Sequence, residues 1–303
     1  MTAFDLFIGI DWSGAKGAHH RGIQLAAASM GDAAPLIIPP PDPKGWTRAD
    51  VAAYLTDRKA AGLHILAGID FAFAHPFGGD GYYPGLKDGP QNPTALWALI
   101  DEINHDHDHL YGGGLWGHPE LRRYYNAPQN KDGRGGRGDL FASRRRLTEN
   151  VAARMNNRSP SPTFNCVGPA GVGTGSLAGM RVLHRLKDTA SVWPFHQVTD
   201  LGQGSLTLVE IFPALYFTMA GVKDAAKKSA PLNALNHGLS YFDTGPCDAI
   251  ADHVPDHDDL DALISAAALR HLHCPLRIFP IADEDRPHAL REGWIFGAGR
   301  VTT

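Results

Sequence analysis

Two copies of the tripeptide Gly-Ile-Asp constrain the fold of this chain more than any other feature. The first ends the apolar run LFIGID at residues 6–11, and the second lies within LAGIDFAFAHP at residues 66–76. A charged side chain at the end of a buried strand is costly unless it is paired, hydrogen-bonded or bound to a metal. Asp11 and Asp70 are therefore candidates for one shared site.

The order of the apolar runs predicts an α/β protein with a mixed sheet. Short runs at 4–10, 22–28 and 35–38 predict three strands, and Thr47 is a suitable N-cap for a helix that stops at Gly62. The run HILAGIDFAF predicts a fourth strand, LTLVEIFPAL at 206–215 a fifth, and DHDDLDALISAAALRHLH at 256–273 a late helix. This is the order expected of the ribonuclease H-like fold, in which the first and fourth strands are central neighbours.

The stretch between the fourth and fifth strands predicts an insertion rather than a second sheet. Residues 77–205 are rich in Gly, Pro, Asn and Arg and poor in strand-like runs, which is typical of mixed helix and loop. We expect a single domain of 303 residues, with a core at 1–76 and 206–303 that forms a five-stranded sheet with flanking helices.

Further acids join the two strand acids. Asp258 and Asp261 are three residues apart on the late helix, and the small Ala262 and Ser265 beside them allow close approach to a sheet. Glu210 lies inside the apolar fifth strand. Hard oxygen ligands suit Mg²⁺ or Mn²⁺. We expect a metal held by Asp11, Asp70, Asp258 and Asp261, with catalysis by Asp11, Asp70, Glu210 and Asp261.

Each acid also has a structural alternative. Asp11 and Asp70 could bond backbone amides in the turns that follow them. Asp258 and Asp261 could cap a helix whose first turn is acidic, and Glu210 could pair with an arginine of the insertion.

Two segments of the insertion are candidates for phosphate binding. Arg144, Arg145 and Arg146 are the centre of the most basic part of the chain, and nucleic acid is the partner that they suggest, although such runs are often merely solvated. The segment GPAGVGTGS lacks the lysine of a nucleotide-binding P-loop. Its backbone amides could still meet a phosphate at the start of the helix SLAGMRVLHRL. The formal net charge of -4 disfavours a protein that binds nucleic acid through global charge.

Seven segments together resemble the domain-of-unknown-function family 429, whose members are described as predicted nucleases of the ribonuclease H fold. They cover nearly the whole chain and are GIDWSGAKG, GIDFAFAHPF, RRRLTEN, VGPAGVGTGSLAGMRVLHRL, VEIFPAL, DDLDALISA and EGWIFG. The D-x-x-D spacing of Asp258 and Asp261 is also similar to the acidic helix of Holliday-junction resolvases of the RuvC type. That resemblance implies Asp11 and Asp70 as strand acids, but the long insertion departs from it, so junction specificity is not carried over.

The sequence therefore favours a metal-dependent nuclease or phosphodiesterase, with two other classes open. One is a nucleotide-binding protein like the actin and sugar-kinase ATPases, although GIDFAFAHP lacks the glycine expected directly after the second Asp. The other is a non-catalytic binding module. No apolar run reaches the length of a membrane span and no secretory leader is apparent, so we expect a cytoplasmic protein without a membrane partner.

Overall fold

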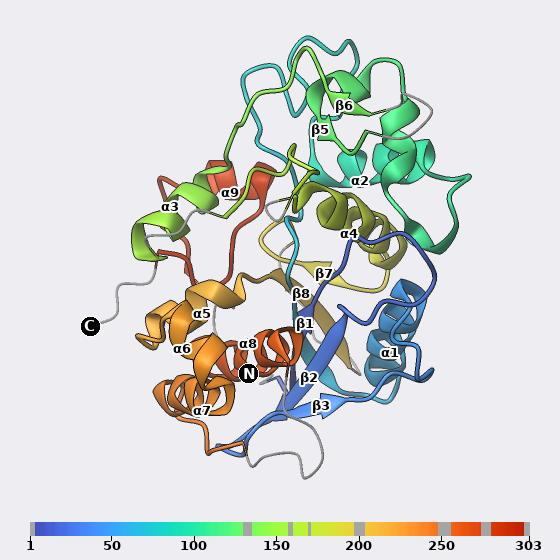
Figure 1. Ribbon diagram of the computed structural model, residues 1–303. Helices are drawn as coiled ribbons and strands as arrows, with labels where there is room; N and C mark the ends of the chain where they lie inside the picture. The colour runs from blue at the N-terminus through green and yellow to red at the C-terminus, as the bar shows by residue number, and fades with distance from the viewer. Residues whose placement is uncertain are drawn as a thin grey trace.

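A mixed β-sheet with helices on both faces organises the molecule (Figure 1). The computed structural model describes residues 4–129, 135–156, 160–168, 171–196, 204–247, 256–273 and 280–299. The described strands of the main sheet lie in the order β3-β2-β1-β4-β8-β7. Their bounds are β1 Leu6–Asp11, β2 Gln24–Ser29, β3 Leu36–Ile38, β4 His64–Ile69, β7 Ser191–Val192 and β8 Ser205–Glu210.

The five strands expected from the sequence are all present, and the sheet has a sixth. The first three strands are joined by antiparallel pairing, whereas β1 with β4, β4 with β8, and β8 with β7 are parallel. The additional strand, β7, has only two residues and comes from the insertion. So short a strand carries no apolar periodicity, so the expectation of five strands missed it.

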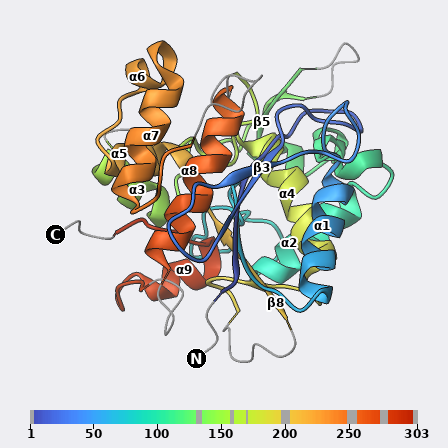
Figure 2. The same cartoon turned by 90° about the horizontal axis from the view of Figure 1, so that it is seen from below.

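Side chains of the central strands alternate between two hydrophobic cores. Phe7 belongs to a core shared with α5 (Pro213–Met219), α7 (Pro231–Tyr241) and α8 (His257–Leu272). Ile8 and Ile10 belong to a core shared with α1 (Arg48–Ala60), α2 (Pro93–Ile103) and α4 (Gly173–Leu186). The view from below shows these two groups of helices on opposite sides of the sheet (Figure 2). Because successive strand residues point to opposite faces, Gly9 and Asp11 lie on the α8 side of β1.

The glycine of each Gly-Ile-Asp tripeptide allows close packing on the α8 side. Gly9 pairs with Gly68 across β1 and β4. A methyl group on Gly9 would lie 2.7 Å from the Ala266 nitrogen and 2.8 Å from Ser265 Cβ. The expectation that α8 approaches the sheet through small residues is therefore confirmed.

The helices of the core follow the sequence closely. Thr47 caps α1 with a capping box, because its side chain and that of Asp50 each accept from the other's backbone amide. The bounds of the described core helices are α1 Arg48–Ala60, α5 Pro213–Met219, α6 Asp224–Ser229, α7 Pro231–Tyr241, α8 His257–Leu272 and α9 Arg286–Glu292. No helix in the described part of the chain is long and apolar enough to cross a membrane.

The insertion is helix and loop with short strand pairs. It contains α2 Pro93–Ile103, α3 Leu147–Asn156, α4 Gly173–Leu186 and the two-residue strands β5 Asn126–Ala127 and β6 Gly136–Arg137. Three 3₁₀ segments lie at Asp108–Leu110, Gly113–Gly117 and Leu121–Tyr124. The insertion therefore contributes helices to the packed layers: α2 and α4 cover one face of the sheet with α1 (Figure 1).

Candidate functional site

Asp11 and Asp70 lie side by side at the carboxyl edge of the sheet. The parallel register pairs Ile10 with Ile69, and the Asp70 amide donates a 3.0 Å hydrogen bond to the Ile10 carbonyl. Asp11 is the last residue of β1, and Asp70 directly follows β4. Both carboxylates therefore leave the sheet on the face covered by α8.

Helix α8 brings two more carboxylates to the same edge. Asp258 and Asp261 lie one turn apart on the side of α8 that packs on Gly9, because Ser265 and Ala262 of that side are in contact range of Gly9. Neither is the N-cap of α8. That role belongs to Asp256, which forms a capping box with Asp259. We call Asp11, Asp70, Asp258 and Asp261 the acidic cluster.

Burial and mutual repulsion disfavour the charged forms of these acids. Burial raises the pKa of Asp11 well above its ordinary value, and the charges of Asp70, Asp261 and Asp258 raise it further. A backbone hydrogen bond from Trp12 lowers the pKa of Asp11 but does not offset the rise. Burial likewise raises the pKa of Asp70 well above its ordinary value, with Asp261 next in importance.

Lys227 of α6 is a counter-charge to the acidic cluster. Its Nζ donates a 2.6 Å hydrogen bond to Asp261 Oδ1, and only 12% of its side chain is exposed. The ammonium also lies 4.4 Å from the centre of the Phe217 ring. Burial raises the pKa of Asp261 despite the opposing charge of Lys227. Sequence reasoning missed Lys227, since nothing in its surroundings marks it as a partner of an acid 34 residues away.

The carboxylates of the acidic cluster are suitable ligands for a hard divalent cation. Asp11 and Asp70 lie side by side, whereas Asp261 is hydrogen-bonded to Lys227. A cation between Asp11 and Asp70 would relieve the repulsion that raises their pKa values. Within the described residues, no three His, Cys, Asp or Glu side chains are placed to hold a metal as they stand. Mg²⁺ is commonly held by one or two carboxylates together with water and substrate phosphate, so two carboxylates suffice.

Glu210 does not join the acidic cluster as a free carboxylate. It is 2% exposed, and Arg146 binds it with two hydrogen bonds, from Nη1 to Oε2 at 2.7 Å and from Nη2 to Oε1 at 2.5 Å. The Phe73 amide donates a third at 3.0 Å. This corrects the expectation of a catalytic Glu210, because strand alternation turns it to the face opposite Asp70 and an arginine of the insertion neutralises it there.

Arg146 is the centre of a buried ionic network. Besides Glu210, its Nε donates to Glu149 Oε1 at 2.9 Å, and its Nη1 to the Glu292 carbonyl at 2.9 Å. Burial alone would lower the pKa of Arg146, but the charges of Glu210 and Glu149 outweigh it and raise that pKa. Burial raises the pKa of Glu149 to about 7 against the opposing charge of Arg146.

The three consecutive arginines do not form one basic surface, which corrects their grouping as a phosphate-binding run. Arg144 donates to the Tyr82 carbonyl at 2.8 Å and lies over the Phe164 ring, while Arg146 is buried. Arg145 is exposed and donates to the Pro160 carbonyl at 3.3 Å. Of the three, Arg145 is exposed, Arg144 is partly buried and Arg146 is buried.

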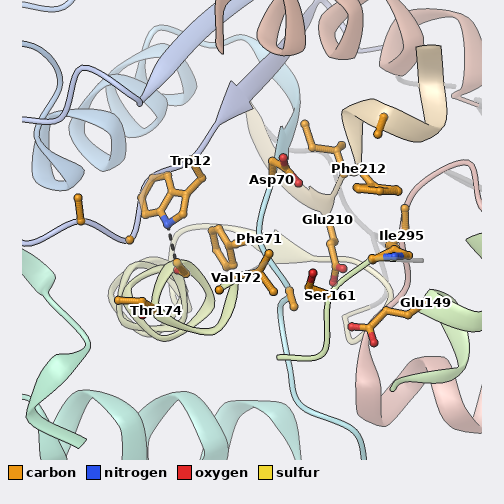
Figure 3. Close-up of a pocket in the computed structure, with 18 of the residues that line it drawn as sticks. Trp12, Asp70, Phe71, Glu149, Ser161, Val172, Thr174, Glu210, Phe212 and Ile295 are labelled. Carbon is orange, nitrogen blue, oxygen red and sulfur yellow. Dashed lines mark hydrogen bonds between the residues drawn. The ribbon is translucent and has the colours of Figure 1, made fainter. Parts of the chain in front are cut away.

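A cavity of about 840 Å³ opens at the carboxyl edge, between the sheet and the insertion (Figure 3). Asp70 and Glu210 lie on its sheet side, and Glu149 and Ser161 belong to the insertion. Of the acidic cluster, Asp70 is the member that lines the cavity. The acid with the best access to a ligand is therefore Asp70.

The amino end of α4 forms the opposite wall of the cavity. Thr174 and Gly175 line it, and the Trp12 indole holds the helix in place by donating to the Gly175 carbonyl at 3.1 Å (Figure 3). Gly14 packs on the same turn of the helix. A methyl group on Gly14 would lie 2.6 Å from the Thr174 carbonyl carbon. No side chain caps this helix, and the Gly173 amide donates a 2.9 Å hydrogen bond to the Asn165 carbonyl. The next two residues, Thr174 and Gly175, bring the positive dipole end of the helix to the cavity.

Fold and site together define an α/β protein with an acidic cluster beside a cavity, at the carboxyl edge of parallel strands where α/β proteins bind ligands. Comparison with family models, with curated proteins and with solved structures finds no match.

Proposed function

We propose that this protein is a divalent-metal-dependent phosphodiesterase or nuclease with a ribonuclease H-like fold, related to the domain-of-unknown-function family 429. The observation that carries the proposal is the convergence of Asp11, Asp70 and Asp261 from β1, β4 and α8, with raised pKa values in the strand pair. Burying repelling carboxylates weakens a fold, so their placement suits a cation that offsets the repulsion.

The strand order supports the fold assignment. Three antiparallel strands lead into a central parallel pair of β1 and β4, followed by β8, which is the order that the ribonuclease H-like fold requires. The position of α8 over that pair brings its Asp261 to the strand acids.

Asp11 and Asp70 would hold Mg²⁺ or Mn²⁺, and Asp261 would add a ligand on release from Lys227. A cation bound there supplies charge for the phosphate and lowers the pKa of an attacking water. The chain's own contributions are the orientation of the carboxylates by the strand ends and of the phosphate by the amino end of α4.

Metal binding and hydrolysis are measured separately. Isothermal titration with Mn²⁺ should show uptake by the wild type that Asp70→Asn weakens at least tenfold, and hydrolysis of bis(p-nitrophenyl) phosphate should require Mn²⁺ and Asp70. Asp57→Asn is the matched control, because the same change is made on the exposed face of α1. Equal Mn²⁺ uptake by Asp70→Asn and the wild type would contradict the proposal, as would hydrolysis that persists in Asp70→Asn.

A further inference from the structure

The cavity has the size of a site for a small molecule. Its volume of about 840 Å³ falls within the range of pockets that enclose a ligand of nucleotide size, about 300–1,000 Å³. Tyr111 and Pro128 of the insertion line it opposite the core residues Asp70 and Ile211. Residues of the core and of the insertion therefore form the two sides of the cavity, and a small ligand could contact both.

In the described part of the chain, few cations line the cavity. Among the described residues that line it, the cations are Lys16 and Arg146, and Arg146 is 1% exposed and bound to Glu210 and Glu149. Of these two cations, Lys16 is the one available to a phosphate. Proteins that bind duplex DNA commonly neutralise about 6–10 phosphates with lysine and arginine.

The cavity also presents flat apolar rings beside its polar groups. Trp12 and Phe212 are partly buried residues that line it from β1 and from the segment before α5. Trp12 packs on Phe71 with ring centroids 5.3 Å apart, and this contact holds the indole beside the amino end of α4. Such rings provide stacking surfaces for a base or another planar group.

We infer that the substrate is a small phosphodiester, of mononucleotide or dinucleotide size, rather than a nucleic-acid polymer. The inference rests on the proposed function and names its substrate class. The phosphate lies between the acidic cluster with its cation and the amino end of α4, while the planar group contacts Trp12 or Phe212. This arrangement uses the opposite electrostatic character of the two walls.

The size of the substrate is tested by comparing three probes in Mn²⁺. These are thymidine 5′-(p-nitrophenyl phosphate), a 20-nucleotide single strand and a 20-base-pair duplex. We expect kcat/KM per phosphodiester bond to be at least tenfold higher for the small diester, and log affinity against log salt to have a slope of about -1. Tighter binding of either polymer, with a slope of -4 or steeper, would overturn the inference. Absence of Mn²⁺ uptake by the wild type would instead overturn the proposed function.

Val172 allows a sharper test of where the phosphate lies. It is 41% exposed, lines the cavity and precedes the first turn of α4. Val172→Glu places a carboxylate at that helix end, where an acid favours the helix, so the melting temperature should not fall. The added charge should raise the KM of the small diester at least fivefold, whereas the uncharged Val172→Gln should leave it within twofold. Equal KM values for the two variants would remove the α4 end from the site.

Discussion

Replacing Arg146 by methionine tests whether the arginine run serves the fold or a phosphate. The side chain of Arg146 is 2% exposed and that of Glu210 3%. Methionine fills much of the same volume but removes the hydrogen bonds from Nη1, Nη2 and Nε, and leaves Glu210 and Glu149 facing each other without a cation. The perturbation therefore exposes the cost of two buried, unpaired carboxylates.

Removing one partner of a buried ion pair costs about 3–5 kcal/mol. A domain has only about 5–15 kcal/mol of stability in total, so Arg146→Met should lose about a fifth of it or more near pH 8. The native state can limit the cost by taking up protons, since the pKa of Glu149 is already about 7 in the presence of Arg146. Each proton held only by the native state stabilises it by about 1.4 kcal/mol per pH unit as pH falls. Without the opposing charge of Arg146, the variant takes up more protons than the wild type as pH falls, so the loss should be smaller at pH 5.5 than at pH 8.

Urea unfolding at pH 8.0 and pH 5.5, followed by circular dichroism, measures both values. The double variant Arg146→Met, Glu210→Gln should recover part of the loss at pH 8.0, because one of the unpaired charges is gone. If Arg146→Met is too unstable to purify, Arg146→Lys takes its place. The expected loss of stability is smaller, because lysine keeps the positive charge but cannot donate the paired hydrogen bonds of a guanidinium. A loss of unfolding free energy under about 1 kcal/mol at both pH values, with weaker phosphate binding, would refute the structural role. It would indicate instead that Arg146 binds the substrate.

Three further predictions concern the acidic cluster and its packing. Gly9→Ala should destabilise the protein by about 1–3 kcal/mol or more in thermal melting, because the added methyl group would clash with the α8 backbone. Gly175→Ala is the control, because the nearest atoms to its added methyl group would be 3.7 Å away, and it should melt within a few degrees of the wild type. The metal-free protein should lose stability as pH rises above about 4, the ordinary pKa of an aspartate, because a carboxyl group with a raised pKa stabilises the native state only while it is protonated. Asp70→Asn should flatten this dependence, and an unchanged slope in urea unfolding would speak against it. Lys227→Met should bind Mn²⁺ more tightly by calorimetry, because the competing ammonium on Asp261 is removed, and weaker binding would show instead that Lys227 supports the site.

The core could be predicted from the sequence because its signals are local. Apolar runs bounded by turn residues marked the strands, and Thr47 with Asp50 marked the start of α1. The adjacency of Asp11 and Asp70 followed from strand order, and the order of the described strands agrees with that expectation. The small residues of α8 likewise indicated the face that packs on the sheet.

The partners of the charged groups could not be predicted in this way, because they depend on contacts distant in sequence. Arg146 and Glu210 are 64 residues apart, and Lys227 and Asp261 are 34 apart. The sequence suggested an arginine of the insertion as a partner for Glu210 but did not indicate which one. The structure separates Arg144, Arg145 and Arg146 because consecutive residues in a loop leave the chain in different directions.

The repeated Gly-Ile-Asp tripeptide has a single physical explanation. Alternation along a strand sends the isoleucine to the core under α1 and α4, and sends the glycine and the aspartate to the face under α8. The glycine must be small because the α8 backbone lies on it at Ala262 and Ala266. That same close approach places Asp261 beside the strand acids. A larger residue at Gly9 would raise the helix and separate the carboxylates, so the packing of the core and the charge density of the site are set by one contact.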